Sequence, residues 1–281
     1  MEEIKEGRLM ATKKIKEAKT NPVVAFIDKY QTAFSLILFF LTWEVLCRIF
    51  KVNEAFLCTP SSALSHLFFK QPDAAYHWGI NISATLKEFV LGFTVTAILG
   101  VFISVCLIWS KTLQKMVMPI FVFFQSMPNI AIIPILLIWI GYGLKTNIII
   151  AFIASFFPMV VNTMAGLNSV DDDLLDLVRY LNASKLQVFL KVRLPMALPY
   201  IYSSLKICTS LSVMGVIVGE LYASDKGLGY VIANAQKYMD TPPMFASLIV
   251  MSMLAWGMYL LVTILERVTM PWRYVKQKSE D

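Results

Sequence analysis

Residues 170–205 read VDDDLLDLVRYLNASKLQVFLKVRLPMALPYIYSSL, and this stretch decides how the rest of the chain is interpreted. It is charged and amphipathic, and it lies between two long apolar runs. Asp171, Asp172 and Asp173 precede apolar residues at helical spacing. Acidic residues at a helix start accept hydrogen bonds from its free N–H groups and complement its dipole. A structured polar hairpin between two apolar runs predicts contact with a partner outside the membrane.

The middle of this stretch predicts two short helices joined by a turn. The first helix carries its apolar side chains at Leu174, Val178 and Leu181. Asn182-Ala183-Ser184 breaks the pattern, and asparagine readily adopts the left-handed conformation of a turn. Ser184 can cap a second helix, whose apolar side chains are Leu186, Phe189 and Val192. Pro195 and Pro199 then end the hairpin and start the next apolar run. The alternative is an amphipathic helix lying on lipid headgroups, but two short helices suit a protein pocket better.

The composition of the whole chain is that of a membrane protein. Hydrophobic residues make up 57% and charged residues 16% of the 281 residues, and the mean hydropathy is +0.65. A soluble protein of this length has too little interior to bury that much apolar surface. The net charge of +6 does not indicate nucleic-acid binding, because the basic residues cluster in a few short loops, as membrane topology requires.

Six apolar runs are long enough to cross a bilayer, which needs about 20 apolar residues in a helix. We expect them at residues 33–50, 89–109, 117–140, 148–167, 197–221 and 245–265. The first run is expected either as a span or as a peripheral helix. The sequence therefore predicts an all-α, polytopic bundle of about six transmembrane helices.

The basic residues predict how this bundle is oriented. Most of the 25 lysine and arginine residues fall on the side that holds both termini and the hairpin, which the positive-inside rule places in the cytoplasm. We expect a cytoplasmic N-terminal segment at 1–32, a transmembrane domain at 33–268 with the hairpin at 170–196, and a cytoplasmic tail at 269–281.

Two features resist a purely lipid-facing interpretation. Gln125, Pro128, Asn129 and Pro134 interrupt the third run, so its helix should kink or break near the middle of the membrane. Irregular backbone at that depth is tolerated only against protein or a water-filled cavity. These residues are expected to line a translocation path or to pack inside the bundle. Glu220, at the end of the fifth run, is either a functional carboxylate of such a path or an interfacial residue.

Other polar groups give weaker signals. Glu88 flanks a span and is expected to be interfacial or to pack between helices, and 225–229 (DKGLG) predicts a tight outer turn. The four cysteines are far apart and show no metal-ligand spacing. His66 and His77 lie in an outer loop without a metal-spacing partner, which argues against a membrane-embedded enzyme. We expect no metal and no cofactor.

The hairpin resembles the EAA motif of ABC importer permeases, whose pattern is Glu-Ala-Ala, three residues, Gly, and a hydrophobic stretch ending in Leu-Pro. Segments elsewhere resemble the nitrate, sulfonate and taurine branch of this family: Leu57-Cys58-Thr59-Pro60-Ser61, Gln125-Ser126-Met127-Pro128, Gly219-Glu220-Leu221 and Gly227-Leu228-Gly229-Tyr230. The resemblance extends from about residue 33 to residue 272. Three departures lie in the hairpin itself: Asp176 replaces Glu, Leu177 and Val178 replace the two alanines, and Asn182 replaces Gly.

The resemblance implies a type I importer permease with the MetI-like fold, a multi-pass protein of the bacterial inner membrane. It implies a permease homodimer, two cytoplasmic ABC ATPase subunits docked on the hairpins, and an extracytoplasmic substrate-binding protein. The ATPase-coupling residues would be Asp176, Arg179, Leu181, Asn182, Ala183, Ser184, Phe189 and Pro195, with Leu181 and Phe189 as apolar knobs. The chain has no GxxxxGK[ST] phosphate loop, so ATP hydrolysis is expected in a separate subunit.

The cargo and one rival class remain open at this point. The resemblance implies aliphatic sulfonates, taurine, nitrate or a vitamin or pyrimidine precursor, with specificity set largely by the binding protein. The alternative is a secondary transporter with six transmembrane helices, which would normally show duplicated halves and buried ion-coupling charges. No clear internal repeat is present, and copurification with a soluble ATPase separates the two classes.

Overall fold

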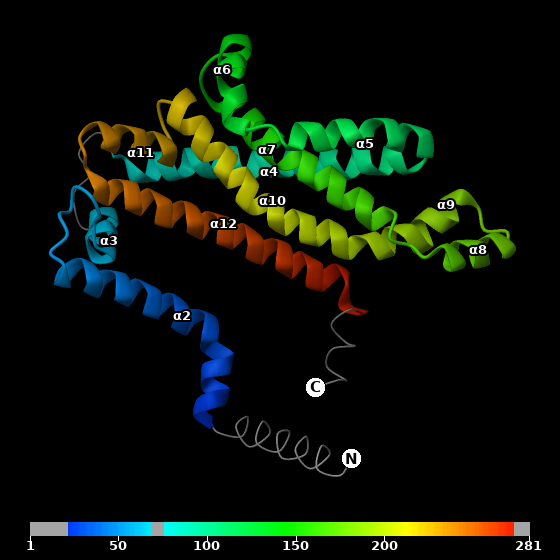
Figure 1. Ribbon diagram of the computed structural model, residues 1–281, viewed down its shortest axis with the longest axis horizontal. Coiled ribbons are helices and arrows are strands. Elements are labelled where there is room, and N and C mark those ends of the chain that lie inside the picture. Colours follow the sequence, from blue (N-terminus) through cyan, green and yellow to red (C-terminus); the bar gives the residue numbers. More distant parts are fainter. Residues whose placement is uncertain (1–21, 69–75, 273–281) are drawn as a thin grey trace, which may run out of the picture. The chain divides into compact units, whose positions relative to one another are not determined.

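The structure is a computed structural model that describes residues 22–68 and 76–272, with side chains described from Phe34 onward. Within these ranges every regular element is helical (Figure 1). The chain divides into two compact units, residues 1–65 and residues 66–281. The helices are α2 (Pro22–Ile49), α3 (Pro60–Phe68), α4 (Trp78–Ile108), α5 (Lys111–Gln125), α6 (Asn129–Ile140), α7 (Leu144–Leu167), α8 (Asp172–Tyr180), α9 (Lys185–Val188), the π-helical turn η1 (Phe189–Arg193), α10 (Leu194–Ala223), α11 (Leu228–Lys237) and α12 (Thr241–Thr269).

The first unit contains α2, which carries the first apolar run. Its apolar side chains from Phe34 onward are mostly exposed. Glu44 connects the end of α2 to the start of α3, because its carboxylate accepts hydrogen bonds from Arg48 Nε at 2.7 Å and from the backbone N–H of Ser61 at 3.0 Å. The expectation that this run crosses the membrane stays a prediction.

The second unit is built around α7, which packs against both α4 and α10. The helices approach closely because small residues face each other. A Cβ built on Gly92 of α4 would lie 2.7 Å from Ala151 Cβ, and one on Gly215 of α10 would lie 2.7 Å from Ala151 Cα. Small residues at such contacts let membrane helices gain van der Waals energy, since lipid removes the usual hydrophobic driving force.

Polar side chains connect the same three helices. Ser155 of α7 hydrogen-bonds to Thr96 of α4 at 2.8 Å and to Ser212 of α10 at 3.0 Å. All three hydroxyls are buried, and hydrogen bonds of this kind hold helices together where no water can compete. On the other side of α10, Lys206 forms an ion pair with Glu266 of α12.

Among the described residues, the structure supports up to five of the six predicted spans, and the helix bounds differ from the predicted ones. In the described part of the chain, four single helices are long and apolar enough to span a membrane, and a bent pair makes five if it counts as one span. The second run was expected to start at Phe89, but α4 starts at Trp78. The first turns of α4 contain the polar residues Asn81, Thr85 and Glu88, so they were not counted as part of an apolar run. The structure shows that these three side chains are buried.

The third run is broken where the prolines predicted a break. α5 ends at Gln125, α6 begins at Asn129, and the two helices meet at an angle of 95°. Pro128 precedes α6 in extended conformation, as proline favours at a helix start. The expected break is therefore confirmed, and the run expected to start at residue 117 begins earlier, at Lys111.

Candidate functional site

The hairpin expected between residues 170 and 196 is present as α8, a turn and α9 at one end of the long helices (Figure 1). Asp171 caps α8, since its carboxylate accepts a hydrogen bond from the backbone N–H of Asp173 at 3.2 Å. Asp172 and Asp173 lie in the first turn, where their charges complement the helix dipole. Leu174 and Val178 are half-buried. These features confirm the first predicted helix.

The turn after α8 has the conformation that the sequence predicted. Asn182 has a φ of +53°, and its backbone N–H donates to the Arg179 carbonyl at 2.9 Å. Ser184 then forms a capping box with Gln187: Gln187 N–H donates to Ser184 Oγ at 3.3 Å, and Ser184 N–H donates to Gln187 Oε1 at 2.8 Å. Such a box satisfies two free helix-start donors at once, so the turn is fixed by bonds within the hairpin.

The second arm of the hairpin runs without a break into the membrane helix. Residues 185–223, comprising α9, η1 and α10, form one helical stretch of 39 residues. Pro195 lies at the junction of η1 and α10 within this stretch. Arg193 Nη1 also donates to the buried carbonyl of Leu167 at 3.1 Å, which ties this arm to the end of α7. The second arm of the hairpin and α10 therefore form one continuous helix.

The two side chains expected as apolar knobs lie differently. Leu181 is 72% exposed at the tip of the hairpin, whereas Phe189 is only 8% exposed. The ring of Phe189 packs against Trp109, with 5.5 Å between ring centroids. Other large apolar side chains of the hairpin are exposed to solvent together with Leu181, namely Leu177, Tyr180, Leu186 and Leu190.

The remaining hairpin residues of the predicted coupling set are accessible. Asp176 and Arg179 are exposed and form an ion pair with 2.7 Å between Oδ1 and Nη1. An exposed pair of this kind contributes about 0–1 kcal/mol, so it orients the two side chains more than it stabilises the fold. Asn182 and Ser184 are exposed, and Ala183 is half-buried.

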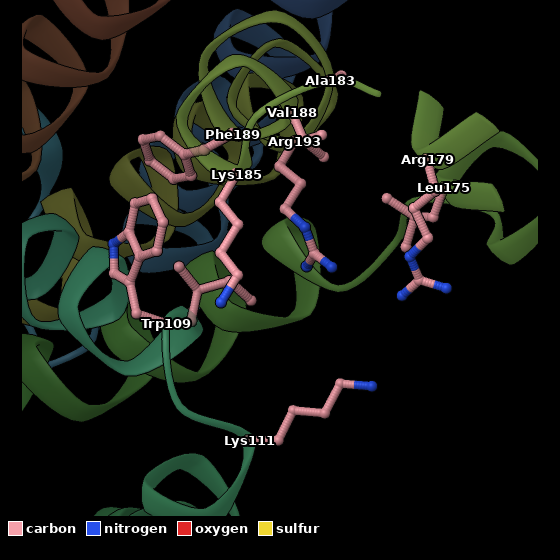
Figure 2. Close-up of a pocket in the computed structure, with 10 residues that line it drawn as sticks. Trp109, Lys111, Leu175, Arg179, Ala183, Lys185, Val188, Phe189 and Arg193 are labelled. Carbon is pink, nitrogen blue, oxygen red and sulfur yellow. The ribbon is translucent and has the colours of Figure 1, made fainter. Parts of the chain in front are cut away.

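A cavity of about 370 Å³ lies beside the hairpin, between it and the connection from α4 to α5. Figure 2 shows Lys185 and Arg193 pointing into this space from the second arm, with Arg179 on the far side of it. Its lining residues are Ile108, Trp109, Lys111, Leu175, Arg179, Ala183, Lys185, Val188, Phe189 and Arg193.

The residues expected to line a path fall into two groups. Gln125, Pro128 and Asn129 are exposed at the break between α5 and α6, and their role stays a prediction. Glu220 is 1% exposed near the far end of α10. Its carboxylate accepts hydrogen bonds from Thr85 Oγ1 and from the backbone N–H of Gly229, both at 2.6 Å.

Glu220 belongs to a buried polar cluster, formed with Asn81, Thr85, Glu88 and Asn147. This cluster caps α11, whose own preceding residue, Gly227, offers no side chain. Asn81 Oδ1 accepts from Gly227 N–H and Thr85 Oγ1 accepts from Leu228 N–H, both at 2.8 Å. The free N–H groups of a helix start need such acceptors, and a carboxylate there also complements the helix dipole.

The other half of the cluster involves the second carboxyl group. Asn147 Nδ2 donates to both oxygens of Glu88 at 3.0 Å. The sequence interpretation missed Asn81, Thr85 and Asn147. Asn81, Thr85 and Glu88 are four and three residues apart, a helical spacing that could have indicated one polar face on α4.

Nothing in the described residues indicates a catalytic centre. No group of histidine, cysteine and acidic residues there is arranged to hold a metal ion. His66 was expected in an outer loop, but it lies in α3 and is buried, with its ring centroid 5.7 Å from that of Tyr76 and 6.2 Å from that of Trp78. The fold and the hairpin together are those of a bundle of long apolar helices that presents an exposed two-helix arm.

The comparison with known families gives this class a name. The model of the family "Binding-protein-dependent transport system inner membrane component" matches residues 96–270, and the chain belongs to this family. It is the permease subunit of an ABC importer, works with a separate ATPase and a substrate-binding protein, and is a multi-pass membrane protein. The secondary-transporter alternative is thereby excluded.

Named relatives support this membership. The chain is 31% identical over 193 residues to the formylaminopyrimidine transport permease protein ThiX of Halalkalibacterium halodurans, covering 69% of this chain and 77% of the relative. It is 28% identical over 231 residues to the putative aliphatic sulfonates transport permease protein SsuC of Bacillus subtilis, covering 82% and 83%. It is 26% identical over 234 residues to the taurine transport system permease protein TauC of Escherichia coli, covering 82% and 85%.

A solved structure shares the fold. The inward-facing MetNI methionine ABC transporter contains a chain that superposes with a TM-score of 0.59 at 19% sequence identity, covering 70% of this chain and 99% of that chain. This confirms the expected MetI-like architecture.

Proposed function

We propose that the α8–α9 hairpin lies in the cytoplasm and is the arm through which a nucleotide-driven ATPase moves this permease. The observation that carries the proposal is the unbroken helical stretch of residues 185–223, which joins the hairpin to a membrane helix. Closure of the ATPase subunits would displace α9, and α10 would follow as a rigid body. Rigid-body movement of this kind alternates the access of a central path between the two sides of a membrane.

The surface of the hairpin suits a protein pocket. Leu181 projects from a tip whose turn is fixed by the left-handed Asn182 and the capping box of Ser184. A large exposed apolar side chain on a rigid support is typical of a binding anchor. Phe189 has a different role in this proposal: packed on Trp109, it braces the base of the hairpin. Asp176 and Arg179, exposed beside the tip, orient the docking.

We also propose a permease homodimer that binds two ATPase subunits. α5 has no buried residue, although its side chains include Ile120, Phe123 and Phe124, all exposed. A helix with this much free surface is suited to a subunit interface. Gln125, Pro128 and Asn129 end α5 and start α6, where a second copy would enclose them beside a shared translocation path.

The proposed cargo is a small solute delivered by the binding protein from outside a bacterial inner membrane. ThiX, SsuC and TauC are named for a formylaminopyrimidine, aliphatic sulfonates and taurine. We therefore propose a sulfonate, taurine, nitrate or a vitamin or pyrimidine precursor. In this arrangement both chain termini lie on the cytoplasmic side with the hairpin.

The proposed role of the hairpin is tested by replacing Leu181, the exposed apolar residue at its tip. Leu181→Asp should leave the chain in the membrane, because the side chain is 72% exposed, and should abolish copurification of the ATPase and substrate uptake. The matched control is Tyr238→Asp, which changes a side chain that is 74% exposed at the other end of the long helices. Tyr238→Asp should retain the ATPase. Full ATPase binding and uptake in Leu181→Asp would refute the proposal.

A further inference from the structure

The cavity beside the hairpin combines an apolar wall with a set of cations. Its apolar wall includes Ile108, Trp109 and Phe189, at the point where α4 leaves the apolar region. Its volume of about 370 Å³ falls in the range of ordinary small-ligand sites. An occupant must therefore have an apolar part and a polar part.

The polar part of the lining is entirely basic. Lys111 comes from α5, Arg179 from α8, Lys185 from α9 and Arg193 from η1, and no carboxylate lines the cavity. Arg179 is paired with Asp176, which lies outside the lining. Within residues 34–68 and 76–272, Lys111 and Lys185 make no ion pair with an acidic side chain. Four cations from four elements repel one another unless an anion lies between them.

We propose that this cavity binds the phosphate of an anionic phospholipid headgroup. Trp109 is half-exposed, as is typical of aromatic side chains at the membrane surface, so the cavity lies at headgroup level. Basic pockets next to the ends of membrane helices bind anionic headgroups. A phospholipid also supplies glycerol and acyl groups for the apolar wall, which inorganic phosphate does not.

The site has a consequence for coupling, which rests on the proposed cytoplasmic position of the hairpin. The bound phosphate connects the start of α5 to both arms of the hairpin and neutralises their mutual repulsion. It holds the arm at a fixed distance from the membrane surface. An anionic lipid in the cytoplasmic leaflet thereby positions the hairpin before the ATPase binds.

The test measures lipid binding by the full chain without any ATPase. The chain is reconstituted in phosphatidylcholine vesicles containing increasing shares of brominated phosphatidylglycerol, which quenches nearby tryptophan fluorescence. The part of the quenching that disappears in Trp109→Phe comes from Trp109, and it measures lipid bound in the cavity. Brominated phosphatidylcholine should quench this component far less.

Paired variants separate the cavity from general surface charge. Lys111→Gln combined with Lys185→Gln should weaken binding about 25-fold in the Trp109 component, since both side chains line the cavity and each direct hydrogen bond to the phosphate is worth about five-fold. The matched control combines Lys115→Gln with Lys191→Gln, which removes two exposed charges from α5 and η1 outside the lining, and should change binding little. Equal effects of the two pairs would overturn the proposal.

A competition experiment distinguishes a phospholipid from free phosphate as the occupant of the cavity. Excess soluble glycerol phosphate should not displace the brominated lipid from the Trp109 component. Displacement would overturn the lipid assignment in favour of a free phosphate. Because the readout needs no ATPase, it is independent of the Leu181→Asp test: a failure of ATPase docking leaves the lipid result standing, and the reverse also holds.

Discussion

Two short helices of this permease, α9 and α11, satisfy the free N–H groups at their starts in opposite ways. α9 is capped by its own sequence, through Ser184 and Gln187 three residues apart. α11 is capped by other helices, through Asn81 and Thr85 of α4 and Glu220 of α10. The first solution keeps the hairpin structured while it projects into solvent. The cap supplied by other helices attaches α11 to α4 and α10. Loss of this cap should therefore destabilise the whole bundle.

The largest expected effect comes from Gly227→Ala, next to the cap of α11. Gly227 has a φ of +110°, and a Cβ there would lie 2.2 Å from Glu220 Cδ. The carboxylate cannot move aside without breaking its bonds to Thr85 and Gly229. Backbone strain and overpacking together should lower the stability of the chain by about 4 kcal/mol. Thermal unfolding of the purified chain in detergent measures this loss.

Gly143→Ala is the matched control for that prediction. Gly143 has a similar φ of +109°, but nothing lies within 4 Å of a Cβ built there. Gly143→Ala should lower the stability of the chain only by the backbone strain of a non-glycine residue at positive φ, about 1–3 kcal/mol. If the two variants unfold at the same temperature, the packed carboxylate of Glu220 does not restrict this position.

The same contrast explains which features the sequence could predict. The turn at Asn182, the cap at Ser184 and the break near Pro128 depend on residues close in the chain, and the structure confirms each of them. Phe189 was expected as an apolar knob of the hairpin, and its ring packs against Trp109, 80 residues away. Two bonds of the α11 cap join residues separated by 143 and 146 positions. Pairings at that distance depend on helix packing, which periodicity does not encode.

An intermediate effect is expected from Asn182→Val at the tip of the hairpin. A β-branched residue in the left-handed conformation costs about 1–2 kcal/mol, and the cost falls on an exposed turn with few contacts. The variant should therefore reach the membrane in normal amounts yet lose ATP-driven uptake, because the tip no longer holds its shape. Uptake into cells, compared with the amount of permease in the membrane, measures this separation.

Asn182→Gly provides the control, since glycine adopts a positive φ without penalty. It should keep uptake close to that of the natural chain. Loss of uptake in both variants would mean that the asparagine side chain itself, and not the turn conformation, is required.

The smallest effect on stability is expected from Ser184→Ala, which removes the local cap. Loss of an N-cap hydroxyl costs about 1 kcal/mol, and only the first turn of α9 depends on it. The thermal unfolding temperature should change little, while hydrogen exchange should accelerate at residues 185–188 and remain unchanged in α11. Ser184→Thr, which keeps the acceptor, should restore protection. If exchange accelerates equally in α11, the two caps are energetically coupled, and the contrast between a locally and a remotely capped helix is lost.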